Sequence, residues 1–456
     1  MGQFFKNIQN TSMKPMTLAL ALTGILMLTA CGRAERSFAE ERTLLRTEEK
    51  PAGEQTDLFA ETVPSGNSGH RTDLKTAEEI AEAIAEEETG ATETEKEGTE
   101  TEDEAPDPGE DTLQLIMVGD ILMHDRIIEA GRTPEGTRSY DFMFAHTADL
   151  IREADLALVN QETILGGESL GYSGYPNFNS PTEVGDAEAA AGFDVVLQAT
   201  NHALDRKAAG IENCLEFWEQ EHPEIEVLGI HDSAEDQQEL CILEIKGFRI
   251  AILNYTYGTN GIKMPAEKPY LVDYLERDRV IRDIQRAETE ADFTILVPHW
   301  GTEYRLDPSK EQKKWADLFL QQGVDLVIGA HPHVIEPVEM LQDAEGHSML
   351  VYYSLGNFVN ATSGTGAGVM NRLVGGMADV TLKRDETGSV SIQEAGVIPL
   401  ICHWEEGLYT TYPMEEYTEE LAAANVIRTQ DGTFSLEACR KLAGDIFGDY
   451  ILKPEQ

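Results

Sequence analysis

The chain has 456 residues, of which 83 are acidic and 35 are basic, and its formal net charge is -48. This excess of negative charge opposes binding to nucleic acid, whose phosphates require a cationic surface. We therefore expect no nucleic-acid partner.

An export signal is predicted at the N-terminus. Two lysines precede an apolar stretch over residues 16–28, which is too short to be read as a spanning helix. Residues 28–31 (Leu-Thr-Ala-Cys) then resemble the bacterial lipobox. We interpret residues 1–30 as a lipoprotein signal peptide followed by lipidation of Cys31, with an ordinary cleaved signal or a short buried helix as the alternatives. A lipid anchor would place the chain at the extracytoplasmic face of the cell membrane.

The next segment, residues 31–111, is rich in Glu, Thr, Gly and Pro and poor in large apolar residues. Such a composition cannot bury enough apolar surface to offset the entropy lost on folding. We interpret it as an acidic disordered linker between the lipid anchor and a folded domain at residues 112–402. Only residues 76–88 have the spacing of a transient helix.

Alternating strand-like and helix-like patterns then predict an α/β fold. Apolar runs predict strands at residues 113–118, 155–159, 194–198, 240–255, 293–297, 324–328, 349–353, 377–382 and 389–400. Helix-like stretches lie at residues 146–153, 204–219, 270–288 and 309–322, the last ending at Gly323. Lys246-Gly247 predicts a hairpin, which together with the late strands accords with a two-sheet β-sandwich flanked by helices. Residues 403–456 are expected to form a small helical extension.

Five short polar segments follow the strand-like runs. They are Gly119-Asp120, Asn160-Gln161-Glu162, Asn201-His202, His299-Trp300-Gly301 and His331-Pro332-His333. Side chains beyond the carboxyl ends of strands can converge on one site in α/β folds. Carboxylates and imidazoles suit divalent ions such as Mn, Zn or Fe, and a bridging carboxylate can hold two of them. The pattern therefore predicts a site for two divalent metal ions.

Single segments also have ordinary structural explanations. Gly119-Asp120 alone is typical of a turn, and Asn201 alone could be the N-cap of the following helix. His331-Pro332-His333 is more specific, because Pro332 stiffens the backbone between two imidazoles. The order of the segments favours a shared site.

At these segments the chain resembles the CapA family of poly-γ-glutamate capsule synthesis proteins, whose fold is that of the calcineurin-like metallophosphoesterases. The resemblance covers roughly residues 113–400. The matching motifs are residues 118–120, 160–163, 200–205, 299–304, 329–334 and 354–358. The resemblance implies the metallophosphoesterase-like four-layer fold, in which helices flank two packed sheets.

The resemblance also implies roles for individual residues. Glu162 would bridge two ions, His202 would protonate or stabilise a leaving oxygen, and Asp205 would orient His202. The residues at metal-ligand positions are Asp120, Glu162, Asn201, His299, His331 and His333. One difference is that many metallophosphoesterases carry Asp-x-His in the first motif, whereas here Leu122 follows and the next histidine is His124.

Other residues near the motifs are candidates for orienting ligands or binding substrate. They are His124, Glu303, Tyr304, Tyr255 and Asn357. For Tyr304, a role in packing the core is nearly as good an explanation as a role at the site. The loop at residues 254–261 is a further candidate for substrate contact. The glycine-rich residues 363–368 do not open a helix after a strand, so we interpret them as a lid or a connector and not as a phosphate loop.

The cysteines after Cys31 give no disulfide framework. Cys214, Cys241, Cys402 and Cys439 permit three complete pairings, and none forms a Cys-x-x-Cys pair. We expect buried free thiols.

Together these features predict a membrane-anchored CapA-like protein in the biosynthesis, export or anchoring of a capsular polymer. Its expected partners are a cell-envelope polymer or its precursor, and membrane subunits of a capsule assembly complex. A metal-dependent, phosphoesterase-like hydrolase is the favoured activity, and a non-catalytic polymer-binding or scaffold subunit is the alternative. Because poly-γ-glutamate is itself an anion, contact with it would require metal ions or basic residues such as Arg305, Lys310 or Arg372.

Overall fold

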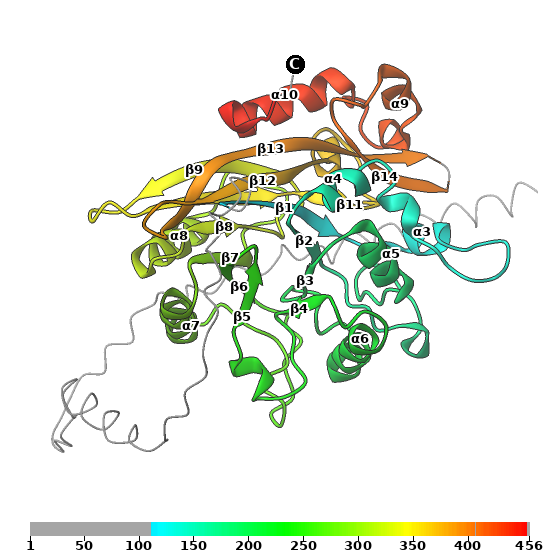
Figure 1. Cartoon of the computed structure of the whole chain (residues 1–456). Helices are drawn as coiled ribbons and strands as arrows, with labels where there is room; N and C mark the ends of the chain where they lie inside the picture. Colours follow the sequence, from blue (N-terminus) through cyan, green and yellow to red (C-terminus); the bar gives the residue numbers. More distant parts are fainter. Residues whose placement is uncertain (1–110, 406, 454–456) are drawn as a thin grey trace, which may run out of the picture. The chain divides into compact units, whose positions relative to one another are not determined.

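The computed structural model describes residues 111–405 and 407–453, which form two β-sheets with helices packed against them (Figure 1). The predicted signal peptide, Cys31, the linker up to residue 110 and the pattern at residues 76–88 lie outside the described residues. Within the described ranges, no helix is long and apolar enough to cross a membrane.

The first sheet contains eight strands, several of which follow the predicted runs. They are β1 Thr112–Ile121, β2 Leu156–Gln161, β3 Val195–Leu197, β4 Glu226–Leu228, β11 Asn357–Val359, β12 Val374–Arg384, β13 Val390–Glu405 and β14 Leu408–Pro413. Their order is β14-β13-β12-β1-β2-β3-β4, and β11 pairs with β1. β1 to β4 are parallel, whereas β12 to β14 are antiparallel to their neighbours. β13 runs through the predicted domain boundary at residues 402 and 403, and it pairs with β14, so the chain beyond residue 402 begins inside this sheet.

The second sheet has the order β5-β6-β7-β8-β10-β9. Its strands are β5 Cys241–Ile245, β6 Phe248–Thr256, β7 Phe293–His299, β8 Leu326–Ile328, β9 Ile335–Gln342 and β10 Ser348–Leu355. The predicted hairpin joins β5 to β6, and both of its turn residues, Lys246 and Gly247, have positive φ. Beyond this hairpin, β6 pairs with β7, β7 with β8 and β8 with β10, and all three pairs are parallel.

The helices lie on the outer sides of the sheets (Figure 1). They are α3 Asp125–Ala130, α4 Ala148–Glu153, α5 Glu183–Ala191, α6 Lys207–Glu221, α7 Arg277–Glu290, α8 Lys310–Gln322, α9 Glu419–Ala424 and α10 Leu436–Phe447. α8 ends at Gly323 as predicted, with φ of 103° at that residue. α7 is shorter than predicted, because Val272 and Tyr274 form bridges to Ile230 and Thr256 and keep this stretch extended.

Side chains of the second sheet alternate between two cores. Ile250 and Ile252 of β6 face the core between the two sheets, whereas Leu253 and Tyr255 belong to a second core with α7 and α8. Burial on both faces leaves the ends of the strands as the place for polar side chains. The predicted α/β fold with two sheets flanked by helices is confirmed.

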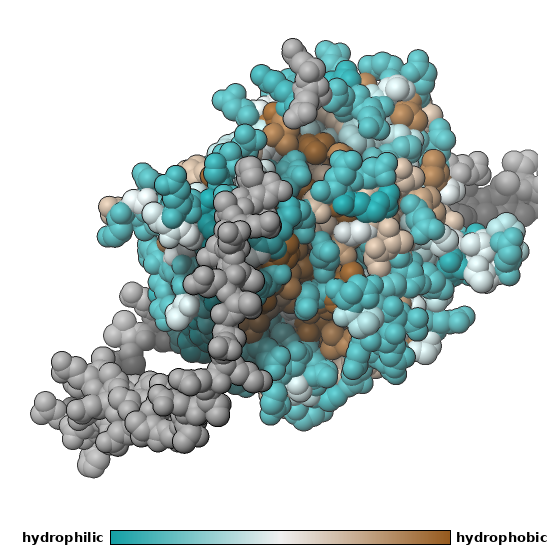
Figure 2. Space-filling model, viewed as in Figure 1, coloured by the Kyte–Doolittle hydropathy of each residue, from teal (hydrophilic) through white to brown (hydrophobic). Residues whose placement is uncertain are grey.

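The remaining cysteines are free thiols. Cys214, Cys402 and Cys439 are buried, and Cys241 is half-buried. On the surface, hydrophilic residues cover most of the face seen in Figure 2, in line with the acidic composition.

Candidate metal centre

All six predicted ligands are buried and lie where strands of the two sheets end. The first sheet supplies Asp120, Glu162 and Asn201, at the ends of β1, β2 and β3. The second sheet supplies His299, His331 and His333, at the end of β7 and in the connection from β8 to β9. The two sheets thus build one site.

Gly119 determines how closely β1, which carries Asp120, approaches the backbone at Gly356. A Cβ atom on Gly119 would lie 1.9 Å from the carbonyl oxygen of Gly356, so only glycine fits here. The next amide, that of Asp120, donates to the same oxygen at 3.0 Å. Asp120 then pairs in register with Asn357 of β11.

Two of the site histidines have an unusual backbone conformation. His331 has φ of 98° and His333 has φ of 57°, in the left-handed region that residues other than glycine seldom adopt. Tyr304 also has positive φ, at 65°, and its amide donates to the Pro332 carbonyl at 2.8 Å. Such strain concentrates at functional sites.

Glu162 lies at the centre of the cluster with no hydrogen-bond partner among the described residues for either carboxylate oxygen. Its Oε1 is 3.8 Å from His299 Nε2, and its Oε2 is 3.6 Å from His333 Nδ1. Burial raises the pKa of Glu162 well above its usual value, and Asp120 adds to this effect. A buried carboxylate without a hydrogen-bond partner is costly, and a bound cation would reduce that cost.

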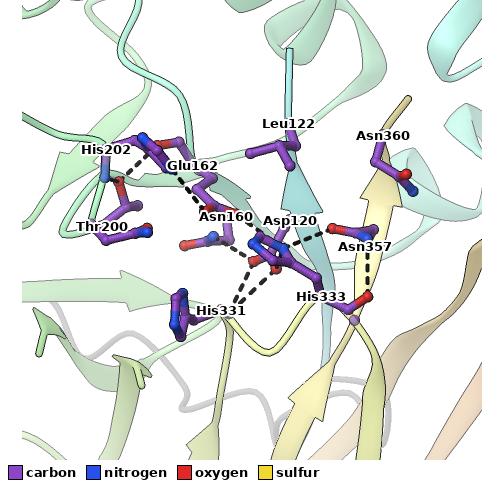
Figure 3. A network of polar contacts seen from close by, with 12 residues as sticks. Asp120, Leu122, Asn160, Glu162, Thr200, His202, His331, His333, Asn357 and Asn360 are labelled. Carbon is purple, nitrogen blue, oxygen red and sulfur yellow. Dashed lines mark hydrogen bonds and ion pairs between the residues drawn. The ribbon is translucent and has the colours of Figure 1, made fainter. Parts of the chain in front are cut away.

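His333 lies between Asp120 and Asn357 (Figure 3). Its Nδ1 is 3.2 Å from Asp120 Oδ2 and 3.1 Å from Asn357 Oδ1. Burial lowers the pKa of His333, but Glu162 and Asp120 outweigh burial and raise it to about 10. Asn160 donates to the other oxygen of Asp120 at 2.8 Å and so fixes that carboxylate.

His299 and His331 form the other side of the cluster. Their rings are 4.9 Å apart, and the Nδ1 atom of each has no partner in the part of the chain that the structure describes. Burial and neighbouring histidines lower the pKa of both. Neutral imidazole is the form that binds metal ions. Asn201 joins this side, with its Oδ1 2.9 Å from His299 Nε2.

Three overlapping groups of these side chains have ligand atoms within 4.8 Å of one another. Glu162 is shared by two of the groups. The groups are Glu162 with His299 and His331, Asp120 with Glu162 and His333, and Glu303 with His331 and His333. Their imidazole and carboxylate donors fit divalent metal ions.

His202 lies beside this cluster and is held by Asp205. Its Nδ1 is 2.7 Å from Asp205 Oδ2, and its Nε2 is 4.0 Å from Glu162 Oε1. The Phe178 ring packs edge-on against His202 at 4.6 Å, a contact that the sequence motifs did not indicate. Asn201 is not the N-cap of α6, because that helix begins at Lys207 after Arg206.

The structure places most of the secondary candidates near the cluster. Asn357 contacts His333, and the Tyr304 ring is 5.9 Å from the His333 ring. His124 is half-buried, its pKa is lowered to about 4 by loss of hydration, and its Nδ1 accepts from the Ala361 amide at 3.2 Å. Leu122 lies next to the cluster, at the Asp-x-His position (Figure 3).

Tyr255 lies elsewhere, which corrects the expectation for this residue. Its hydroxyl donates to Asp283 of α7 at 2.9 Å, because residue 255 faces the second core. Tyr257 is the tyrosine of this loop at the site, with its ring 4.7 Å from His331. Asn260 also reaches the site, where its Oδ1 accepts from the Asn201 side chain at 3.4 Å. Tyr255 lies inside β6, whereas Tyr257 follows the last residue of that strand, Thr256, and so is not held to the face that Tyr255 occupies.

The fold and the site define an α/β protein with two packed sheets and a buried carboxylate and histidine cluster of the kind that binds metal ions. The chain belongs to the family described as "Bacterial capsule synthesis protein PGA_cap", whose profile matches residues 114–362. The resemblance to CapA seen in the motifs is thereby confirmed.

Two relatives carry names from capsule synthesis. The capsule biosynthesis protein CapA of Bacillus anthracis is 27% identical over 256 residues, which cover 54% of this chain and 59% of that protein. The PGA biosynthesis protein CapA of Bacillus subtilis (strain 168) is 28% identical over 255 residues, covering 55% and 64%. The chain thus spans less than two thirds of the length of either relative.

Solved structures with partial likeness include two nucleotidases. A 5'-nucleotidase precursor from Thermus thermophilus aligns with 64% of this chain and 54% of its own, at a TM-score of 0.40 and 14% identity. Haemophilus influenzae NAD nucleotidase aligns with 75% of this chain and 65% of its own, at a TM-score of 0.41 and 14% identity.

Proposed function

We propose that this protein is an enzyme of capsular polymer biosynthesis that hydrolyses or transfers a phosphoester or amide-linked group of the polymer or its precursor. The observation that carries the proposal is the buried Glu162 carboxylate, which has no hydrogen-bond partner among the described residues and is shared by two groups of potential metal ligands. The capsule and PGA biosynthesis names of the two Bacillus relatives support the choice of polymer.

Glu162 would bridge two divalent ions. Asp120 and His333 would hold one ion, and Asn201, His299 and His331 would hold the other. When bound, such a pair stabilises developing negative charge and lowers the pKa of water. The chain itself supplies a closed setting for this chemistry, because all these side chains are buried.

His202 would act as the proton donor. Its Nδ1 is bound to Asp205, so its Nε2 is directed toward the Glu162 side of the cluster. Because the carboxylate of Asp205 also accepts from the Phe178 amide at 2.7 Å, it cannot easily rotate away. An imidazole fixed in this way can deliver a proton to a leaving oxygen or nitrogen.

The proposal places the enzyme outside the cytoplasmic membrane, attached through a lipid on Cys31. The support is the lipobox-like sequence at residues 28–31. Expression of Cys31→Ser should move the protein from the membrane fraction to the medium or the soluble envelope fraction. Retention of this variant in the membrane would contradict the anchor.

A second candidate is a non-catalytic subunit that binds polymer and membrane subunits of a capsule assembly complex. Leu122 favours it, because a leucine cannot replace the ligand that Asp-x-His would supply to the Asp120 side.

The metal content of the full-length chain, measured by inductively coupled plasma mass spectrometry, tests the proposal. We expect close to two ions per chain in the wild type and far fewer in His331→Ala/His333→Ala. Turnover of γ-glutamyl and phosphoester substrates that is lost in His202→Ala would support the enzyme. Bound metal without turnover would favour the non-catalytic subunit, and folded protein without metal would exclude the two-metal hydrolase.

A further inference from the structure

Arg372 is a cation held next to the candidate metal centre of a very acidic protein. It lies in the short 3-10 helix η4 Val369–Leu373 and is half-buried, whereas Arg305 and Lys310 are exposed. Its guanidinium carbon lies 3.6 Å from the centre of the Tyr304 ring. That ring in turn is 5.9 Å from the ring of His333. Arginine, tyrosine and histidine thus form a continuous stack that ends at the metal cluster.

The backbone of Arg372 is fixed by residues that also position His333. The Arg372 carbonyl accepts from the Asn357 side chain at 2.9 Å and from the Asn360 side chain at 2.8 Å. Asn357 also donates to the His333 carbonyl and contacts His333 Nδ1 (Figure 3). The position of Arg372 is therefore coupled to that of a proposed metal ligand.

The charge of Arg372 is not neutralised within the described residues. Many cations of the protein form ion pairs, for example Arg279 with Asp273 and Arg384 with Asp292. In residues 111–405 and 407–453, by contrast, Arg372 has no ion pair, and its guanidinium makes one hydrogen bond, to Thr362 Oγ1 at 2.6 Å. Most of its five N–H donors are thus left for another acceptor.

Tyr304 adds an independent sign of function. It is 47% exposed although it is aromatic and packs against Arg372. Its φ of 65° is unusual for a bulky residue, and its amide is tied to the loop that carries the site histidines. An exposed ring with a strained backbone contributes little to packing of the core. It can, however, hold a guanidinium in place through a cation–π contact, so that the guanidinium is free to bind a charged group of a ligand.

We propose that Arg372, supported by Tyr304, binds an anionic group of the substrate on the His333 side of the metal centre. The group is an oxyanion, either a carboxylate of a γ-glutamyl chain or a phosphate. This inference rests on the proposed function for the identity of the substrate. It explains how a chain with a net charge of -48 can hold a polyanion, since the arginine fork offers local, directional donors.

The test compares anion binding by the full-length wild type and by Arg372→Gln, using calorimetric titration with inorganic phosphate and with a short γ-glutamyl oligomer. The matched control is Arg384→Gln, since Arg384 also packs over an aromatic ring, that of Phe248 at 4.7 Å, but lies on β12 and pairs with Asp292. We expect Arg372→Gln to weaken binding at least tenfold and Arg384→Gln to leave it unchanged. Arg372→Lys should restore only part of the affinity, because lysine lacks the planar fork.

A purely structural role is distinguished by Thr362→Val, which removes the internal contact of Arg372 but keeps its charge. If Thr362→Val weakens binding as much as Arg372→Gln does, or if Arg372→Gln binds like the wild type, the inference is wrong. Failure of both probes to bind the wild type would also overturn it.

Metal content is measured in the same samples. Absence of metal would refute the proposed function, while the comparison of the two arginine variants would still decide the role of Arg372. The probe that binds more tightly distinguishes carboxylate from phosphate.

Discussion

Asp205 Oδ2 lies 2.7 Å from His202 Nδ1 and also accepts from the Phe178 amide at 2.7 Å. One buried oxygen therefore fixes both the imidazole and the loop that carries the aromatic ring packed against it. The other ring nitrogen of His202 is left to face the metal cluster.

The contact between His202 and Asp205 predicts that substitutions of either residue lower the catalytic rate without changing metal binding. His202→Ala should lower kcat at least about 100-fold, since general acid catalysis contributes roughly 10²–10⁴-fold. Asp205→Asn should have a smaller effect of the same kind, because it disturbs only the orientation of the imidazole. Metal content should remain that of the wild type in both. His222→Ala is the control, since His222 forms a similar contact with Asp186 of α5 at 2.8 Å, away from the site. Loss of metal from His202→Ala would show that His202 is a ligand instead.

Glu162 and Glu188 provide a matched pair of buried glutamates. Both are fully buried, and neither has a hydrogen-bond partner among the described residues for its carboxylate oxygens. Glu162→Gln should reduce metal binding at least tenfold, because an amide is a poor bridge between two cations. Glu188→Gln, on α5, should bind metal like the wild type. Metal titration of the chelator-treated protein measures both, and equal affinities would exclude Glu162 as the bridge.

Gly119 should be intolerant of any side chain. Gly119→Ala would force the backbone away from Gly356 and should destabilise the fold by about 3 kcal/mol, the upper range for overpacking. Urea denaturation measures this change. Gly444→Ala is the control, since a Cβ there meets open space within α10 and should stabilise by up to about 1 kcal/mol. Equal stabilities of the two variants would contradict the close approach.

The two carboxylate contacts of His231 predict that the folded protein loses stability at alkaline pH. It lies between Asp236, at 3.1 Å, and Asp273, at 2.9 Å. Burial lowers the pKa of His231, but the hydrogen bonds to the two carboxylates outweigh burial and raise it to about 9. The folded pKa thus exceeds the unfolded value of 6.5, so the contribution is complete below pH 6.5 and is lost as the pH rises through 9.

The upper limit of this contribution to the free energy of unfolding is about 3–4 kcal/mol, at about 1.4 kcal/mol per pKa unit. Denaturation curves between pH 6 and 10 should show it in the wild type and not in His231→Gln. Parallel pH profiles for the two proteins would show that the histidine does not carry the charge assigned to it.

The candidate metal cluster could be predicted because each proposed ligand lies at the end of a short apolar run or a few residues beyond it. Val324 to Ile328 has the pattern of a buried strand, so the imidazoles of His331 and His333 were expected at its end. The same rule located His299 after β7. Strand ends in one sheet meet at a common edge, and this makes such residues recognisable without a structure.

Contacts made by side-chain direction and by distant segments could not be predicted in this way. Tyr255 and Tyr257 lie two residues apart at the end of β6, and nothing in the sequence shows that Tyr257 and not Tyr255 lies beside His331. The stacking of Arg372 on Tyr304 joins segments that follow strands of different sheets. From the sequence, Arg372 is only one of several basic residues that could contact an anion. The residues next to it in the chain do not distinguish a stacked arginine from a solvated one.

The division of the candidate ligands between the two sheets has a consequence for how the proposed metal ions would enter the protein. Asp120, Glu162 and Asn201 come from one sheet, and the histidine ligands come from the other. The two groups that share Glu162 are not complete until the sheets have docked, so binding of a pair of ions would follow folding, and a bound ion would then hold the two sheets together across their interface. The ions that are abundant where the chain folds, more than the ligand chemistry alone, would decide which metal it carries.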